Sequence, residues 1–100
     1  MAEVIWTQSA KSDLIQIGDY IALDKPRAAA KLVSNIMDSV ALLGQFPESG
    51  RYPSELPSGA IRELIIPPCR VFYRYSQQTV FILHIMREEQ QFRRYMLGLE

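Results

Sequence analysis

The sequence is poor in the residues that build disulfides and structural metal sites. It contains one cysteine, Cys69, and one histidine, His84, among 100 residues. A lone cysteine excludes a disulfide within the chain, and we therefore expect a protein of a reducing compartment, the cytoplasm. Structural zinc sites need about four cysteine or histidine ligands at short spacings, which this chain lacks. We expect neither a metal nor another cofactor.

The chain also lacks a net charge, with 11 basic and 11 acidic residues and a pI of about 6.6. Proteins that bind RNA or DNA tightly without help show a basic excess, because contacts with phosphates dominate the affinity. The balance of charges argues against direct, tight nucleic-acid binding by this chain alone.

No apolar run approaches the roughly 20 residues that a membrane-spanning helix needs. The first residues, MAEVIWTQ, lack the basic start and apolar middle of a signal peptide. We therefore expect no association with a membrane. With 48% hydrophobic and 22% charged residues, the composition is that of one globular domain spanning residues 1–100.

What the sequence does contain is four short runs rich in β-branched and aromatic residues, which predict strands. They are residues 3–7, 61–66, 71–75 and 80–86. The last three are separated only by Pro67-Pro68 and by residues 76–78, which favours an antiparallel meander. The final run is apolar at nearly every position, so we expect a central strand that is covered on both faces.

Two segments in the first half have the period of amphipathic helices. The first has an apolar face of Ala10, Leu14, Ile17 and Ile21, and we expect Ser9 to be its N-cap. The second follows an expected N-cap at Asp24, tolerates Pro26 in its first turn and ends at Gly44. The short link at residues 23–25 predicts an antiparallel helix hairpin.

The remaining segments are a loop at residues 45–59, which contains three prolines and two glycines, and a C-terminal stretch of helical composition. In that stretch one helical face would hold Phe92, Tyr95, Met96 and Leu99. The predicted fold is α+β, in the order β-α-α-β-β-β-α. We expect an antiparallel sheet packed by the helix hairpin, with a short C-terminal helix.

All seven basic residues of residues 51–100 are arginines. A guanidinium binds a phosphate or carboxylate with two hydrogen bonds. Four of these arginines lie in or beside the predicted meander, at Arg62, Arg70, Arg74 and Arg87. We interpret the sheet as a recognition surface, although arginine stems also serve simply to cover apolar surface.

Strand alternation predicts which faces these side chains share. Arg70 and Arg74 fall on one face, and Arg87 on the face of Phe81, Leu83 and Ile85. His84, inside the last strand, is expected to be a hydrogen-bonded core residue rather than a catalytic one. No nucleophile motif, phosphate-binding glycine loop or metal-ligand spacing is present.

Three segments, in this order, resemble the RelE/ParE superfamily of toxins from type II toxin–antitoxin modules. They are VIWTQSAKSDLIQIGDYIA, AAAKLVSNIMDSVALLGQFPESGRYP and IRELIIPPCRVFYRYSQQTVFILHIM. The last is similar to the family's R-E-L motif followed by a Y-R-hydrophobic-hydrophobic-Y-R block. The resemblance covers residues 3–97 and implies the fold described above.

RelE-like members cleave messenger RNA in the ribosomal A site with lysines, arginines and a C-terminal tyrosine. The resemblance places four candidate catalytic residues on this chain, Arg62, Arg70, Arg87 and Tyr95. One lysine position is occupied by Leu64, which cannot act as an acid, a base or a phosphate ligand. Glu88 and Glu89 follow Arg87, where RelE-like members stay basic.

ParE-like members share the fold, lack that catalytic set and are associated with poisoning of DNA gyrase. The first segment, with Trp6, Asp13 and Tyr20, is more similar to this branch. We therefore expect a ParE-like toxin that inhibits gyrase by binding and is not an enzyme, with target-binding residues Arg70, Arg74 and Arg87. The alternatives are a RelE-like, ribosome-dependent endoribonuclease and an inactive relative that only binds its antitoxin.

The resemblance implies a cognate antitoxin under each alternative. The apolar helix pair and the rim of the sheet would offer a groove for an amphipathic helix or an added strand. The candidate antitoxin-binding residues are Phe92, Tyr95 and Met96.

Overall fold

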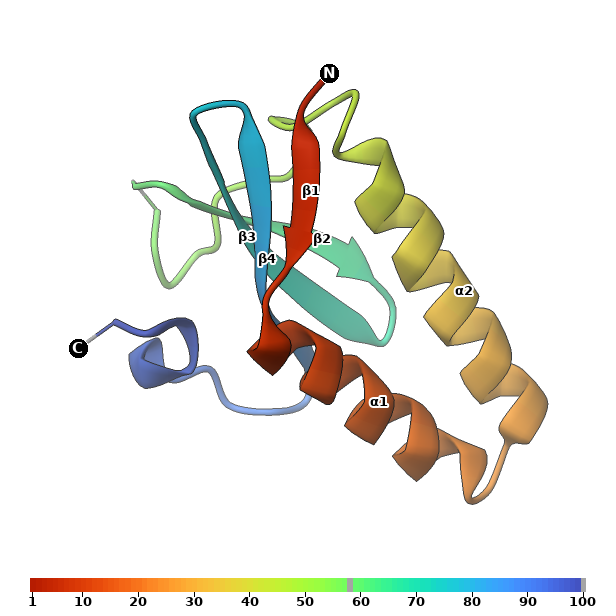
Figure 1. Cartoon of the computed structure of the whole chain (residues 1–100). Helices are drawn as coiled ribbons and strands as arrows, with labels where there is room; N and C mark the ends of the chain where they lie inside the picture. The colour runs from red at the N-terminus through yellow and green to blue at the C-terminus, as the bar shows by residue number, and fades with distance from the viewer. Residues whose placement is uncertain (58, 100) are drawn as a thin grey trace.

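The computed structural model describes residues 1–57 and 59–99 (Figure 1). Its elements are β1 (Glu3–Trp6), α1 (Gln8–Ala22), α2 (Pro26–Leu42), β2 (Ile61–Ile66), β3 (Cys69–Ser76), β4 (Thr79–Arg87) and the 3-10 helix η1 (Arg94–Leu97). Their order confirms the prediction. Ser58 and Glu100, which the predicted loop and terminal segment include, lie outside the described residues. No helix of the described part is long and apolar enough to cross a membrane.

The four strands form one sheet in the order β1-β4-β3-β2. The meander of β2, β3 and β4 is antiparallel, as predicted, and β4 is a central strand. The sheet is nevertheless mixed, because β1 pairs with β4 in parallel, from Glu3 opposite Thr79 to Trp6 opposite Ile82. The prediction of an antiparallel sheet was wrong for this strand. The helix hairpin returns the chain so that β2 runs in the same direction as β1, and the two turns of the meander give β4 that direction again.

The helix hairpin of α1 and α2 lies against one face of the sheet, which we call the covered face (Figure 1). The main core lies between them and contains Ile17, Leu32, Ile36, Val40, Val71, Tyr73, Val80, Ile82 and Ile85. We call the opposite side the open face. A smaller cluster there is formed by Ile61, Phe72 and Met86, with Leu56, Leu83, Phe92, Met96 and Leu97 packed against it.

The helix caps differ from the predicted ones. Thr7, not Ser9, is the N-cap of α1, and its hydroxyl accepts a hydrogen bond from the Ala10 amide at 3.2 Å. The same hydroxyl donates to the Ile82 carbonyl at 2.6 Å, which fixes the start of the helix where β1 ends. Lys25, not Asp24, is the N-cap position of α2, which starts directly at Pro26 and has no side-chain cap.

A β-bulge in β4 changes the predicted sharing of faces. The register shifts so that Phe72 pairs with His84 and Tyr73 pairs with Ile82, which leaves Leu83 without a partner in β3. Beyond the bulge the alternation is reversed: Ile85 belongs to the core of the covered face, whereas Leu83 packs on the open face. The predicted common face for Arg87, Phe81, Leu83 and Ile85 was therefore wrong.

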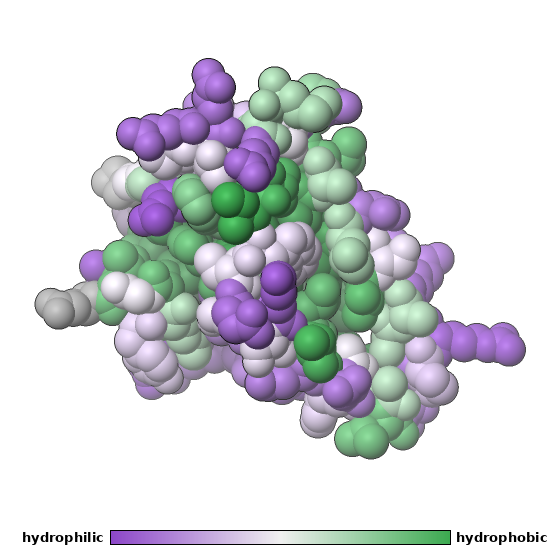
Figure 2. Space-filling model, in the orientation of Figure 1, coloured by the Kyte–Doolittle hydropathy of each residue, from purple (hydrophilic) through white to green (hydrophobic). Residues whose placement is uncertain are grey.

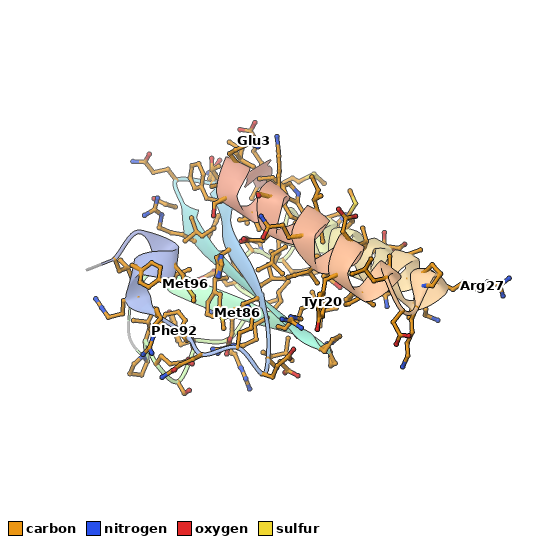
Figure 3. The ribbon with its side chains drawn as sticks, turned by 90° about the horizontal axis from the view of Figure 1, so that it is seen from below. Glu3, Tyr20, Arg27, Met86, Phe92 and Met96 are labelled. Atoms are coloured by element: carbon orange, nitrogen blue, oxygen red, sulfur yellow. The ribbon has the colours of Figure 1, made fainter. Side chains whose placement is uncertain are left out.

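The C-terminal segment is less helical than predicted. Among the described residues of this segment, Arg94–Leu97 alone form a helix, of the 3-10 type, so the α-helical period does not apply to the residues before it. Phe92 and Met96 pack against the open-face cluster near Met86 (Figure 3). Tyr95 does not belong to this cluster and is 73% exposed.

Candidate functional site

The open face carries a cluster of charged side chains around Arg70. The Arg70 guanidinium donates to Glu63 Oε1 at 2.8 Å and to both oxygens of Glu55, at 2.7 and 2.9 Å. It also lies over the ring of Phe72, with 4.8 Å from Cζ to the ring centroid. Hydrogen bonds from Arg70 lower the pKa of the Glu55 carboxyl to about 2, from its usual value of 4.5. In this structure the central arginine is therefore bound by two of the chain's own carboxylates.

Glu63 is the buried centre of this cluster. Its side chain is 1% exposed, and its second oxygen accepts a hydrogen bond from Arg51 Nε at 2.9 Å. A buried carboxylate is costly unless charged partners satisfy it, and here two arginines do so. The backbones of Arg51 and Glu63 also pair with each other in both directions, which fastens the loop between α2 and β2 to the edge strand.

Arg62 lies on the covered side and fixes the same loop. Its guanidinium donates to the carbonyls of Glu48 and Gly50 and to the hydroxyl of Tyr52. Gly50 in turn donates to the Tyr73 hydroxyl, and a Cβ atom at Gly50 would stand 2.6 Å from that oxygen. Arg62 thus holds the loop between α2 and β2 against the edge strand.

Arg74 and Arg87 differ in setting from each other. Arg74 is exposed on the open face, with its guanidinium 5.7 Å from the centroid of the Phe81 ring. Arg87 lies at the margin of the covered side, 4.5 Å from the ring centroid of Tyr20 on α1, and pairs with Glu89 at 3.1 Å.

The candidate catalytic residues are not all brought together, although Tyr95 lines the same groove as Glu55, a partner of Arg70. Arg62 and Arg87 lie on the covered side at opposite ends of the meander, since Arg62 pairs with Tyr73 and Arg87 with Cys69. Arg70 lies on the open face. Leu64, at the position of a lysine in RelE-like members, packs against the core of the covered face.

The target-binding candidates are likewise divided between the two faces, with Arg70 and Arg74 on one and Arg87 on the other. The antitoxin-binding candidates are closer together. Phe92 and Tyr95 line a groove of about 540 Å³ beside η1, together with Glu55, Arg93, Arg94 and Leu99. Met96 lies next to it and lines a smaller pocket with His84.

A second, larger groove runs between the outer sides of α1 and α2. It has a volume of about 760 Å³ and is lined mainly by small and apolar residues, among them Leu14, Ile15, Gly18, Ala29, Val33 and Met37. Leu14, Ile15 and Met37 also border a neighbouring hollow at Trp6. Figure 2 shows hydrophobic residues on the surface where the two helices meet.

His84 is half-buried and hydrogen-bonded, in line with its expected structural role. Its Nδ1 lies 2.6 Å from Asp13 Oδ2, and the same oxygen accepts the Ile85 amide at 3.0 Å. Asp13 therefore fastens α1 to the part of β4 that extends beyond β1. Cys69 is fully buried, and burial raises the pKa of its thiol to about 11, as for an unreactive core cysteine.

Comparison with known proteins assigns the family. Residues 4–92 match the family described as the ParE toxin of the type II toxin–antitoxin system parDE. The chain belongs to the ParE toxin family. It is 35% identical over 86 residues to "Toxin RelE2" of Caulobacter vibrioides, a match that covers 85% of this chain and 93% of that protein. Both names fall within the RelE/ParE superfamily, so the resemblance of the sequence is confirmed.

Solved structures confirm the toxin fold. The chromosomal ParDE toxin–antitoxin system from P. aeruginosa contains a chain with a TM-score of 0.74 and 31% identity, covering 87% of this chain and 96% of that one. A chain of the RelBE2 toxin–antitoxin complex from Mycobacterium tuberculosis has a TM-score of 0.57 at 22% identity, covering 86% and 96%, and shows the fold alone. The protein is therefore a toxin of a type II toxin–antitoxin system.

Within this ParE-family toxin, sequence reasoning missed the acidic half of the open-face cluster. Glu63 stands in the R-E-L motif, where strand alternation places it on the face of Arg70, and that pairing could have been found. Glu55 could not have been found, because it lies in an irregular loop whose path only the folded chain fixes. Asp13 entered only through the resemblance of the first segment, whereas it accepts a hydrogen bond from a backbone amide of β4.

Proposed function

We propose that this ParE-family toxin acts by binding DNA gyrase and carries out no chemistry of its own. The separation of the catalytic candidates carries the proposal. Cleavage of RNA without a metal needs a base, an acid and positive groups around one phosphate. Arg62 and Arg87 lie on one side of the sheet and Arg70 on the other, which argues against a site in which the three arginines surround a single phosphate.

The open face is the surface that we propose for the target. It presents Arg74 to solvent beside the partly buried ring of Phe81, an arrangement in which a partner can contact both charge and apolar surface. Arginine and aromatic residues are enriched where protein interfaces gain most of their affinity. Arg70 can contribute only after its contact with Glu55 is exchanged, and Arg87 contributes only at the margin.

We further propose a cognate antitoxin that binds the groove between α1 and α2. This groove is long, open and apolar, with Asp19 and Asp38 on its lining. An amphipathic helix with an apolar face and flanking basic residues would fit such a surface. Phe92, Tyr95 and Met96 would then provide a second contact for the antitoxin beyond the hairpin. Occupation of both sites would also stabilise a small domain by mass action.

Induction of the chain in bacterial cells, with and without an antitoxin from the adjacent reading frame, tests the proposal. We expect growth arrest with DNA-damage signalling and loss of plasmid supercoiling, and rescue by the antitoxin. Cleavage of messages at ribosomes with intact supercoiling would instead establish the RelE-like alternative. Normal growth of cells that contain folded toxin would establish the inactive relative.

A further inference from the structure

The two carboxylates bound to Arg70 are held very differently. Glu63 belongs to β2, its side chain is 1% exposed, and it also binds Arg51. Glu55 belongs to the loop between α2 and β2, and its side chain is 33% exposed. A local turn, in which the Leu56 amide donates to the Pro53 carbonyl, presents Glu55 to the sheet. Glu63 is thus a fixed part of the fold, whereas Glu55 can leave without disturbing a strand.

Arg70 binds Glu55 with the geometry that it would use to bind a carboxylate from another molecule. Two guanidinium nitrogens donate to the two carboxylate oxygens, at 2.9 and 2.7 Å. This parallel pair of bonds is the geometry that arginine offers to any carboxylate, including one from another molecule. Arg70 also keeps its bond to Glu63 and its position over Phe72, so its orientation does not depend on Glu55.

The surroundings of Glu55 suit a peptide better than a nucleic acid. The groove of about 540 Å³ that begins at Glu55 continues over Phe92, Tyr95 and Leu99, with Arg93 and Arg94 beside them. An occupant would therefore meet apolar surface and positive charge together. A chain with no net charge lacks the long-range field by which proteins attract polyanionic RNA or DNA.

We propose that Glu55 is an internal stand-in for an acidic side chain of a partner protein. In the complex, a glutamate or aspartate of the partner would replace Glu55 on Arg70, and its apolar neighbours would lie in the groove beside η1. The exchange is between two carboxylates, so the charge on Arg70 remains satisfied throughout. The inference rests on the proposed function in one respect, that a protein binds on this side of the sheet.

The test uses the isolated, folded chain and a fluorescein-labelled peptide of alternating glutamate and leucine, with binding followed by fluorescence anisotropy. Glu55→Gln removes the internal competitor, and we expect it to bind the peptide about five- to tenfold more tightly than the wild type does. Glu48→Gln is the matched control, because it makes the same charge change in the same loop, where Glu48 lies 3.6 Å from Arg62. An equal gain in that control would show a general charge effect and overturn the proposal.

Further variants keep the test decisive. Adding Arg70→Gln to Glu55→Gln should abolish the gain, and Glu55→Asp, which keeps the charge but shortens the reach, should show a smaller gain. In the wild type, the NMR signal of the Arg70 Nε–H group should shift as the peptide is added. No gain in the folded variants and no shift in the wild type would overturn the proposal. So would a larger gain for a single-stranded RNA oligonucleotide of equal charge than for the peptide. Because the assay contains no gyrase, a negative result would overturn this inference without bearing on the proposal that gyrase is the target.

Discussion

The covered and open faces of the sheet are built from alternate residues of the same strands, yet they differ in chemistry. On the covered face, Val71, Tyr73 and Ile82 are fully buried against the helix hairpin. On the open face, the neighbouring positions hold Phe72 under Arg70, and Glu63 between two arginines. The covered face stabilises the domain through apolar burial. The open face combines a small apolar core with charged side chains that pair with each other.

This contrast assigns stability to the covered face of the sheet and, in our proposal, binding of the target to the open face. The hairpin tip, where Arg27 lies, and the segment that contains Phe92 and Met96 are at opposite ends of the molecule (Figure 3). Because the main core lies on the covered side, a partner on the open side can bind without touching it. The following predictions are ordered from the largest expected effect on the unfolding free energy to the smallest.

Ile36→Ala should have the largest effect, because Ile36 is fully buried between α2 and the covered face. We expect the unfolding free energy to fall by about 3 kcal/mol, from lost burial and the cavity that remains. Urea denaturation followed by circular dichroism measures it. Met37→Ala, one residue later and 53% exposed, is the control and should cost much less. Equal losses would mean that the hairpin does not pack on the sheet as described.

Glu63→Gln should have the next largest effect and tests the open face. It keeps the shape of the side chain but removes the charge that binds both Arg51 and Arg70. We expect a loss of about 2 kcal/mol, because charged hydrogen bonds to a buried group are replaced by weaker ones. Glu89→Gln, at a carboxylate that is 60% exposed, should change stability by less than about 0.5 kcal/mol. A neutral result at Glu63 would mean that the cluster is dispensable for folding.

Glu55 should contribute less to the unfolding free energy than Glu63 does, and its contribution should depend on pH. Hydrogen bonds from Arg70 lower the pKa of Glu55 to about 2 in the folded chain, so the contact is most stabilising when the carboxylate is charged in both states. The stability difference between the wild type and Glu55→Gln should be complete above about pH 5 and should shrink as the pH falls from 4.5 toward 2. Denaturation curves across this range measure it. A difference that grows on acidification would have the wrong sign for this ion pair.

Arg74→Ala should barely change stability, because Arg74 is exposed and lies over the face of Phe81 at 5.7 Å. It should nevertheless reduce growth inhibition in cells if the open face binds the target. Arg27→Ala, which removes the same charge at the hairpin tip, should leave growth inhibition unchanged. Equal toxicity of both variants at equal toxin levels would remove Arg74 from the binding surface.

Much of the fold could be predicted from local pattern, because apolar periods of two and of about 3.6 mark strands and helices directly. The pattern failed where a single residue changes the geometry. Leu83 forms a bulge that reverses the faces of Ile85 and Arg87, and no feature of the apolar run indicates it. The parallel pairing of β1 also depends on contacts between residues far apart in the chain.

The candidate site was less predictable for a related reason. The arginines of the meander were visible in the sequence, but the partners of Arg62 and one partner of Arg70 lie in the loop at residues 45–59. The bidentate contact of Arg70 with Glu55, 15 residues away, depends on the path of that loop. The sequence could therefore indicate an anion-binding side chain without showing that an anion already occupies it.

The most direct test of the proposed function is a supercoiling assay with purified gyrase, relaxed plasmid and the purified toxin. We expect the wild-type toxin to block supercoiling, the antitoxin to restore it, and Arg74→Ala to require a higher toxin concentration. Full supercoiling at saturating toxin, together with cleavage of messenger RNA on programmed ribosomes, would contradict the account.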